Sequence, residues 1–125
     1  IPGVVAVNAP KYINQTTAAN EIEHLNGIEK KLLEGIPLII ICDDSNFVAA
    51  TINNFLWVTF TRSNPSHDIH GTRSFIENKH WGCNGSLIID ARIKPHHAPP
   101  LIKNPDIEKR VDALGIKGKS LHGII

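Results

Sequence analysis

Two adjacent carboxylates, Asp43 and Asp44, directly follow an apolar run at residues 38–42. Acidic residues at the carboxyl end of a strand supply the hard oxygen ligands that Mg²⁺ prefers, and an aspartate there is also suited to accept a phosphoryl group. The same two residues, with Ser45 after them, are good N-caps for a following helix. Helix capping is the simpler interpretation, and metal or phosphoryl chemistry remains the alternative.

Imidazoles and a thiol form a second group of candidate ligands. Zinc takes four such ligands, often in pairs two to four residues apart. The spacing between the pairs is irregular and they fall in predicted loops, so we expect surface or loop roles for most of them and not a structural zinc site. The pairs are His67 with His70, His80 with Cys83, and His96 with His97.

Other well-known sites are absent from the sequence. It contains no Gly-x-Ser-x-Gly nucleophile elbow, no Gly-x-Gly-x-x-Gly and no phosphate-binding loop of the Gly-x4-Gly-Lys-[Ser/Thr] type. With a net charge of +1, two Trp and one Tyr, an aromatic and basic nucleic-acid surface is not expected. The apolar runs are far shorter than the roughly twenty residues of a membrane span, so no membrane span is expected.

Length and composition predict one globular domain. The chain has 125 residues, of which 42% are hydrophobic and 20% charged. It begins with Ile1 and contains no Met, from which we expect a processed chain or, more simply, a fragment of a longer one. Two cysteines cannot form a disulfide framework, and reduced thiols favour a cytoplasmic location.

The first half of the chain must position the paired acids. Hydrophobic periodicity predicts strands at 4–7, 38–42 and 55–61, with helices at 15–34 and 46–53 between them. This alternation predicts an α/β fold, a three-layer sandwich with a mainly parallel sheet. Ligands gather at the carboxyl ends of such strands, which here carry Asn8, Asp43-Asp44 and Thr61-Arg62.

The second half is less regular. Short strands are predicted at 73–76 and 86–90 with a loop at 77–85, followed by a proline-rich extended arm at 91–103 and a helix at 104–114. Residues 1–91 carry a net charge of −3 and residues 92–125 a net charge of +4. A basic end of this kind either docks on the acidic body or on a neighbouring subunit, or is simply solvated.

Three blocks of sequence together resemble one family. They are Ile36-Pro37-Leu38-Ile39-Ile40-Ile41-Cys42-Asp43-Asp44, the segment 55–68 with Trp57-Val58-Thr59-Phe60-Thr61-Arg62-Ser63-Asn64-Pro65, and the segment 89–101 with Asp90-Ala91-Arg92-Ile93-Lys94. In order and spacing they resemble the carboxy-terminal domain of UbiD-type decarboxylases, which act on 3-octaprenyl-4-hydroxybenzoate or 4-hydroxybenzoate. The resemblance covers nearly the whole chain.

The resemblance implies a function. Full-length enzymes of this family decarboxylate aromatic or α,β-unsaturated acids with prenylated FMN, a divalent metal and potassium. Their cofactor and their Arg-Glu-Glu proton-handling set belong to other domains, so no catalytic residue and no bound cofactor are expected in this chain alone. The carboxy-terminal domain mediates oligomerisation and closes over the substrate, which makes the rest of the decarboxylase chain and further copies of the protein the expected partners.

The resemblance also assigns candidate residues. Lys94 falls at the family's lysine, and Lys94, His96 and His97 lie in the arm, where together with Arg62 they are candidate contacts to the substrate cleft. Arg92 replaces a family threonine, so a role for that hydroxyl does not carry over. Two other interpretations remain, a stand-alone module using Asp43 and Asp44 for metal or phosphoryl chemistry and a non-catalytic interaction domain.

Overall fold

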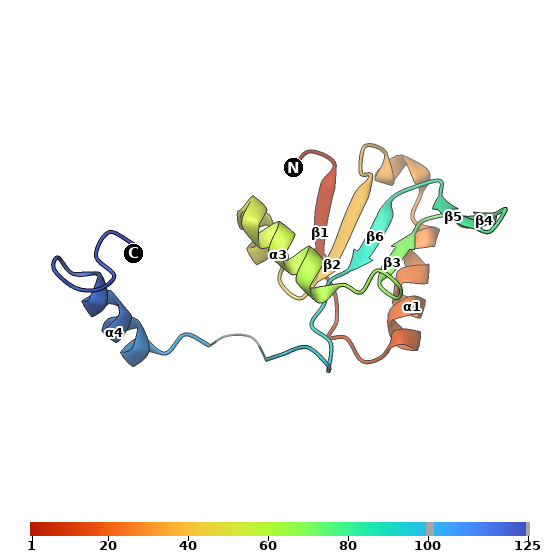
Figure 1. Ribbon diagram of the computed structural model, residues 1–125. Helices are drawn as coiled ribbons and strands as arrows, with labels where there is room; N and C mark the ends of the chain where they lie inside the picture. The colour runs from red at the N-terminus through yellow and green to blue at the C-terminus, as the bar shows by residue number, and fades with distance from the viewer. Residues whose placement is uncertain (100–101, 125) are drawn as a thin grey trace.

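The sheet is mixed but mainly parallel. A computed structural model describes residues 1–99 and 102–124, and Figure 1 shows a sheet flanked by helices, with the carboxy-terminal helix lying apart from it. The strand order is β1-β2-β6-β3, in which β1, β2 and β6 are parallel and β3 is antiparallel to β6. The strands are β1 (Val4–Asn8), β2 (Leu38–Cys42), β3 (Ile69–Gly71) and β6 (Leu87–Asp90). The predicted α/β fold is confirmed.

Helices cover both faces of the sheet. On one face α2 (Ser45–Ala50) and α3 (Ile52–Arg62) pack against it, and on the other lies α1 (Gln15–Glu23). Because β2 is covered on both sides, its successive side chains enter two separate cores. One core contains Ile40, Cys42, Val48, Val58, Ile89 and Ala91, and the other contains Ile22, Ile39, Ile41 and Ile88.

The third predicted strand, at 55–61, is wrong, because this segment is helical in α3. Thr51 caps the helix by accepting a hydrogen bond from the backbone N–H of Asn54 at 3.0 Å. Burial then falls on the consecutive residues Val58 and Thr59, which strand alternation would place on opposite faces. The helix cap and packing on the sheet outweigh the β-propensity of the aromatic and β-branched residues. The third parallel strand is β6.

Several predicted boundaries also differ. The helix at 15–34 ends at Glu23 and continues as two 3₁₀ turns, His24–Gly27 and Lys30–Leu33, because Ile28 between them is extended. The helix at 46–53 ends at Ala50, since extended Thr51 separates α2 from α3. The short strand β3 was not predicted.

The predicted loop at 77–85 contains a strand. β4 (Ser74–Glu77) and β5 (His80–Cys83) form an antiparallel hairpin in which Glu77 pairs with His80. Asn78 and Lys79 both have positive φ, 49° and 67°, which is the backbone of a tight two-residue hairpin turn. The turn lacks the usual glycine, so its sequence signal is weak.

The carboxy-terminal helix α4 (Pro105–Gly115) confirms the predicted capping pattern. The side chain of Asn104 accepts hydrogen bonds from the backbone N–H groups of Asp106 and Ile107, and Pro105 occupies the first turn. Its apolar stripe of Ile107, Val111 and Leu114 is exposed, and Figure 1 shows α4 lying apart from the sheet. Residues 100 and 101 of the predicted arm lie outside the described residues.

Candidate functional site

The candidate site lies at the carboxyl end of the sheet, where three distant segments meet. Asp43 follows β2, Arg62 ends α3, and Ile93 belongs to the arm that follows β6. One carboxylate oxygen of Asp43 accepts the backbone N–H of Ile93 at 2.8 Å and lies 3.4 Å from the guanidinium of Arg62. Asp43 therefore holds the end of a helix and the start of the arm against the end of the central strand.

Asp44 has a different role from Asp43. Its side chain accepts the backbone N–H of Phe47 at 3.0 Å and caps α2. The neighbouring Asn8, at the end of β1, accepts the backbone N–H of Ser45 at 2.5 Å. The two adjacent carboxylates thus have separate protein partners and do not converge on a common point.

Lys94 is an interior residue. Its side chain is only 3% exposed, and its ammonium lies 3.2 Å from the carboxylate of Asp68. It also donates hydrogen bonds to the backbone carbonyls of Arg62 (3.1 Å) and Asp90 (2.9 Å). Through these hydrogen bonds, the buried side chain of Lys94 connects the arm to the end of α3 and to β6.

Arg92 forms a second buried ion cluster. Its guanidinium makes charge-assisted contacts with Asp90 (2.7 Å) and Glu21 (2.6 Å) and donates to the backbone carbonyl of Pro10 at 2.9 Å. Burial lowers the pKa of Arg92, but the hydrogen bonds and charges of the two carboxylates outweigh it and raise the pKa overall. The ring of Tyr12 lies 5.5 Å from this guanidinium and 5.3 Å from the Lys94 ammonium.

The sequence did not predict these buried ion pairs. The available signal was the alternation of Asp90, Arg92 and Lys94 after an apolar strand, which places three charges at the mouth of a covered sheet. The partners Glu21 and Asp68 lie far away in the sequence, and no local pattern links them to the arm.

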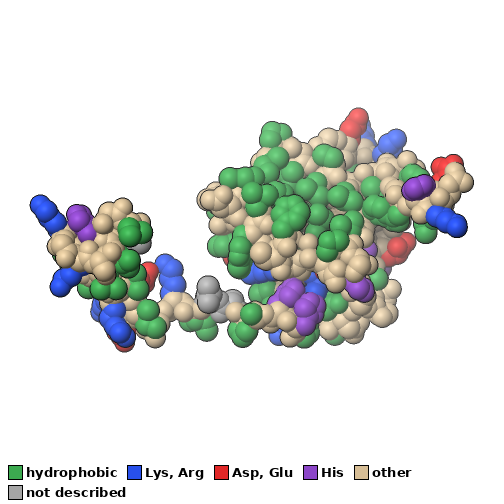
Figure 2. All heavy atoms as spheres, viewed as in Figure 1, with side chains coloured by type: hydrophobic (Ala, Val, Ile, Leu, Met, Phe, Trp, Pro, Cys, Tyr) green, Lys and Arg blue, Asp and Glu red, His purple; other side chains and the backbone are tan. Residues whose placement is uncertain are grey.

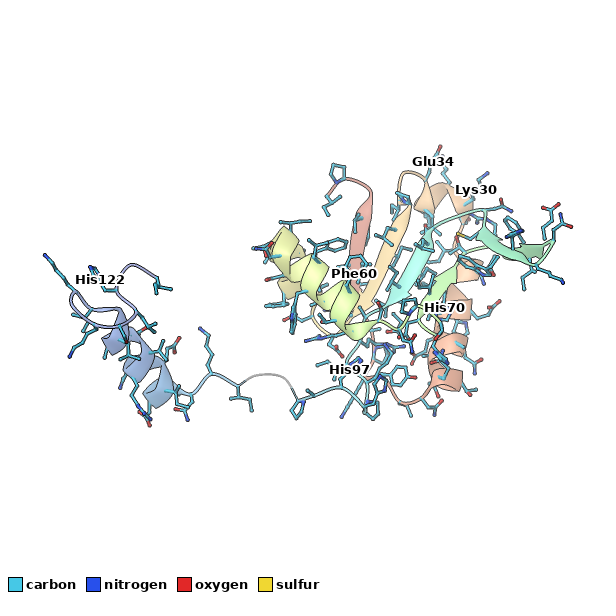
Figure 3. All side chains as sticks on the ribbon, viewed as in Figure 1. Lys30, Glu34, Phe60, His70, His97 and His122 are labelled. Atoms are coloured by element: carbon cyan, nitrogen blue, oxygen red, sulfur yellow. The ribbon has the colours of Figure 1, made fainter. Side chains whose placement is uncertain are left out.

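Three of the predicted contact residues line one pocket. Arg62, His96 and His97 border a cavity of about 430 Å³ between the end of α3 and the arm, and Figure 3 shows His97 below the carboxyl end of that helix. The Arg62 guanidinium lies 5.1 Å from the Trp57 ring, and the two imidazoles pack edge to face at 4.5 Å. The remaining lining residues are Trp57, Thr61, Ile93, Ala98 and Pro99.

The imidazole of His97 is held in one tautomer. The backbone N–H of Lys94 donates to its Nδ1 at 3.1 Å, so a neutral ring carries its proton on Nε2. Burial lowers the pKa of His97, and the charges of His96, Lys94 and Arg62 lower it further, which favours this neutral form. His97 thus presents an N–H donor.

The other histidines do not gather into a metal site. His67 contacts the hydroxyl of Ser66 at 2.6 Å, while His70 lies on β3 and His80 on β5. Within residues 1–99 and 102–124, no three His, Cys, Asp or Glu side chains come together in a geometry for a metal ion. Among the helices of the same residues, none has both the length and the apolar character needed to cross a bilayer.

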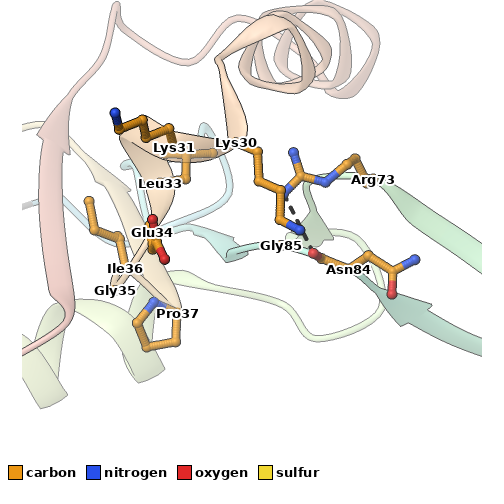
Figure 4. A pocket seen from close by; sticks show the side chains of 10 residues that line it. All are labelled: Lys30, Lys31, Leu33, Glu34, Gly35, Ile36, Pro37, Arg73, Asn84 and Gly85. Carbon is orange, nitrogen blue, oxygen red and sulfur yellow. Dashed lines mark hydrogen bonds between the residues drawn. The ribbon is translucent and has the colours of Figure 1, made fainter.

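A second pocket lies at the opposite end of the sheet. It has a volume of about 580 Å³ and is bordered by the 3₁₀ turn Lys30–Leu33, the approach to β2 and the Arg73 side chain, which hydrogen-bonds the Asn84 carbonyl (Figure 4). Ligand sites of parallel sheets lie at the carboxyl ends, and this pocket is at the amino end. None of the residues predicted to contact a substrate lines it.

Comparisons with known proteins give matches of limited extent. No protein-family model matches the chain. An uncharacterized protein of Chlamydia muridarum is 29% identical over 86 residues, which cover 69% of this chain and 15% of that protein. A protein of Chlamydia pneumoniae that is named as a 4-hydroxybenzoate decarboxylase subunit is 32% identical over 79 residues, which cover 63% of this chain and 14% of that protein.

The chain therefore spans about a seventh of the length of these curated relatives. The name of the Chlamydia pneumoniae protein agrees with the family whose residue blocks this sequence resembles. The similarity suggests a protein related to the UbiD-type decarboxylases.

Proposed function

We propose that this chain is the carboxy-terminal domain of a prenylated-FMN-dependent decarboxylase acting on aromatic or α,β-unsaturated acids, in which it assembles subunits and forms one wall of the substrate cleft. The observation that carries the proposal is the meeting of the three family-like blocks at one end of the sheet. Asp43 from the first block contacts Arg62 from the second and Ile93 from the third. Such convergence is typical of segments that serve one site.

The burial of Lys94 supports a positioning role for the family-like lysine. By bonding the carbonyls of Arg62 and Asp90, it fixes the start of the arm relative to α3. The arm then carries His96 and His97 to the pocket. In the proposed enzyme this rigid corner would face the domains that hold the cofactor.

The pocket does not suit prenylated FMN itself. A flavin phosphate is usually held by several backbone N–H groups or cations. Among the Lys and Arg side chains of the described residues, Arg62 alone lines this pocket, and it is partly paired with Asp43. No step of the reaction is therefore assigned to the flavin in this chain. The other domains of the longer enzyme would instead bind the cofactor, the metal and the potassium ion.

Assembly is proposed to run through the arm and α4. The stripe of Ile107, Val111 and Leu114 is apolar and exposed on a helix that lies apart from the sheet. Covering such a stripe removes apolar surface from water, which favours contact with a further subunit. Both cysteines of the chain are free thiols, which supports a cytoplasmic location for the enzyme.

The alternative of stand-alone metal or phosphoryl chemistry is less well supported. Asp43 is engaged by Arg62 and the Ile93 backbone, and Asp44 caps α2. A metal ion would have to displace a cation from one carboxylate and a helix cap from the other.

The proposed function is tested by measuring CO₂ release from 4-hydroxybenzoate with added prenylated FMN, Mn²⁺ and K⁺. The isolated chain should release no more CO₂ than a blank, while the enzyme containing the chain should turn over. In that enzyme, Lys94→Met should lower turnover because the arm loses its anchor, and the exposed control Lys117→Met should not. CO₂ release by the isolated chain would overturn the proposal, as would an inactive longer protein.

A further inference from the structure

The guanidinium of Arg62 is incompletely used. Its side chain is 17% exposed, yet within the described residues its guanidinium makes a single hydrogen bond, the 3.4 Å contact with Asp43. A guanidinium has five N–H donors. No N–H group of Arg62 is among the buried, unpaired side-chain atoms of the described residues, so its unused donors are accessible to solvent or to a ligand. By contrast, buried Arg92 contacts Asp90, Glu21 and the Pro10 carbonyl. The spare donors of Arg62 border the 430 Å³ pocket.

A second donor belongs to His97, which lines the same pocket. His97 accepts the Lys94 backbone N–H on Nδ1, which leaves the Nε2–H of the neutral ring without a hydrogen-bond partner among the described residues. Arg62 thus offers charged N–H donors, and neutral His97 offers one further N–H donor. A carboxylate accepts such donors on two oxygens and matches the planar guanidinium fork.

Aromatic and apolar side chains make up most of the remaining lining. The Trp57 ring and the His96 imidazole border the pocket together with Ile93, Ala98 and Pro99. Aromatic walls favour a planar partner, because flat surfaces stack with full contact. The volume of about 430 Å³ lies within the range of small-molecule sites.

Asp43 sets the strength of the site. Its carboxylate lies 3.4 Å from the guanidinium and competes with any incoming anion for the same positive charge. It also has a structural partner in the Ile93 backbone N–H, which a neutral amide oxygen at this position would still accept. Charge and structure at residue 43 can therefore be separated by substitution.

We propose that this pocket binds a carboxylate carried on a flat, apolar body, with Arg62 and His97 holding the carboxylate and Trp57 packing against the body. The inference deepens the proposed function and rests on it for the biological role of the ligand, which would be an acid substrate or product at the cleft wall. Binding itself is a property of this chain's own residues.

Benzoate is the first probe, added to the ¹⁵N-labelled chain and followed by amide chemical shifts in NMR spectra. We expect saturable shifts centred on Trp57, Arg62, Ile93 and His97, with a Kd of about 1 mM for so small a ligand. Benzamide has the same shape without the charge, and inorganic phosphate has charge without the flat body. Both should bind at least tenfold more weakly.

Two substitutions should act in opposite directions. Arg62→Gln should weaken benzoate binding at least tenfold, and Asp43→Asn should strengthen it several-fold because it frees the guanidinium. Arg110→Gln, on the exposed face of α4, is the matched control and should leave the Kd unchanged. The same spectra show whether each variant is folded, and Asp43→Asn keeps the test decisive if Arg62→Gln unfolds.

Absence of benzoate shifts at 20 mM in the folded chain would overturn the inference. Benzamide binding as tight as that of benzoate would show that the charge does not matter. Phosphate binding as tight as that of benzoate would show that the apolar wall does not matter. Each of these results contradicts the pocket assignment alone, because the proposed function is tested separately by CO₂ release from the longer enzyme.

Discussion

Arg92 and Lys94 determine how the arm begins, because both are buried with carboxylate partners. Taking an ion out of water is costly unless its partners are well placed, so the surrounding loops have to be held in position. Arg92 connects β6 to α1 through Glu21, and Lys94 connects the arm to Asp68 before β3. The buried guanidinium of Arg92 thus has two carboxylate partners, Asp90 and Glu21.

This predicts that Arg92→Thr is strongly destabilising. The substitution leaves the carboxylate of Asp90 buried without its cation, which costs about 3 kcal/mol or more. Urea unfolding followed by circular dichroism measures the free energy of unfolding. Arg110→Thr on exposed α4 is the control and should change it by less than about 0.5 kcal/mol. A loss for Arg92→Thr as small as that of the control would contradict a structural role for the cluster.

Histidine burial predicts a fall in stability in mild acid. Burial is the main cause that lowers the pKa of His70 and of His97 below the ordinary value of 6.5. The unfolded chain therefore binds these protons first as the pH falls, and the folded state loses stability from about pH 6.5 downward. The melting temperature should be lower at pH 5.5 than at pH 7.5.

The matched variant for this pH dependence is His70→Gln combined with His97→Gln. Both rings are removed from the titration, so the drop in melting temperature between pH 7.5 and 5.5 should become smaller. A drop of unchanged size would show that other groups cause it.

Part of the site was predictable at the residue scale. Asp43 and the arm lie at the carboxyl ends of strands, as expected. Arg62 was expected at the end of a third strand and instead reaches Asp43 from the end of α3. The sequence did not reveal that Lys94 is interior, because its partner Asp68 follows a turn whose path no local pattern specifies.

At the scale of elements, α3 is the main difference between the prediction and the structure. The segment 55–61 is rich in residues that favour strands, but the cap at Thr51 and the packing of Val58 make it helical. Three parallel neighbours remain, because β6 takes the place expected for this segment. The family resemblance then rests on the residue blocks and on the name of the Chlamydia pneumoniae relative, with no support from the predicted third strand.

The helix makes a specific mutational prediction. Val58 and Phe60 would share a face in a strand, whereas in α3 Val58 is 0% exposed and Phe60 is 68% exposed. Val58→Ser should lower the free energy of unfolding by about 2 kcal/mol or more, and Phe60→Ser by less than about 0.5 kcal/mol. Similar losses in urea unfolding for both variants would instead favour a strand.

The better-predicted elements have simple local signals. β2 is an uninterrupted apolar run, and α4 combines a cap, an early proline and an apolar stripe. The strand predicted at 73–76 is present as β4, whereas β5 and β3 escaped prediction because they are short and their pairing partners determine them more than their own residues do.

At the scale of the whole molecule, the predicted charge contrast is smaller than the sequence suggested. Since Arg92 and Lys94 are buried with carboxylates at the end of the sheet, residues 1–99 carry a net charge of −1 and residues 100–125 carry +2. Electrostatic attraction therefore contributes less to docking of the tail than a −3 to +4 contrast implies. The proposed assembly of subunits therefore depends mainly on apolar surface. Such surface lies on α4 and on the face formed by α3, where Figure 2 shows hydrophobic side chains gathered.

This predicts self-association that depends on the apolar stripe of α4. Sedimentation of the chain at about 100 μM should show dimers or larger assemblies, and Val111→Asp should shift them to monomer. Lys109→Gln changes the same helix without touching the stripe and should leave the assembly intact. A wild-type monomer at this concentration would contradict assembly through α4.

The central claim is that this domain works as part of a much longer decarboxylase. The direct measurement is an immunoblot of the source cells under denaturing conditions, with an antibody raised against the purified chain. We expect one band at several times the 13.8 kDa of the chain, as the length of its relatives suggests. A single band at 13.8 kDa would contradict the claim.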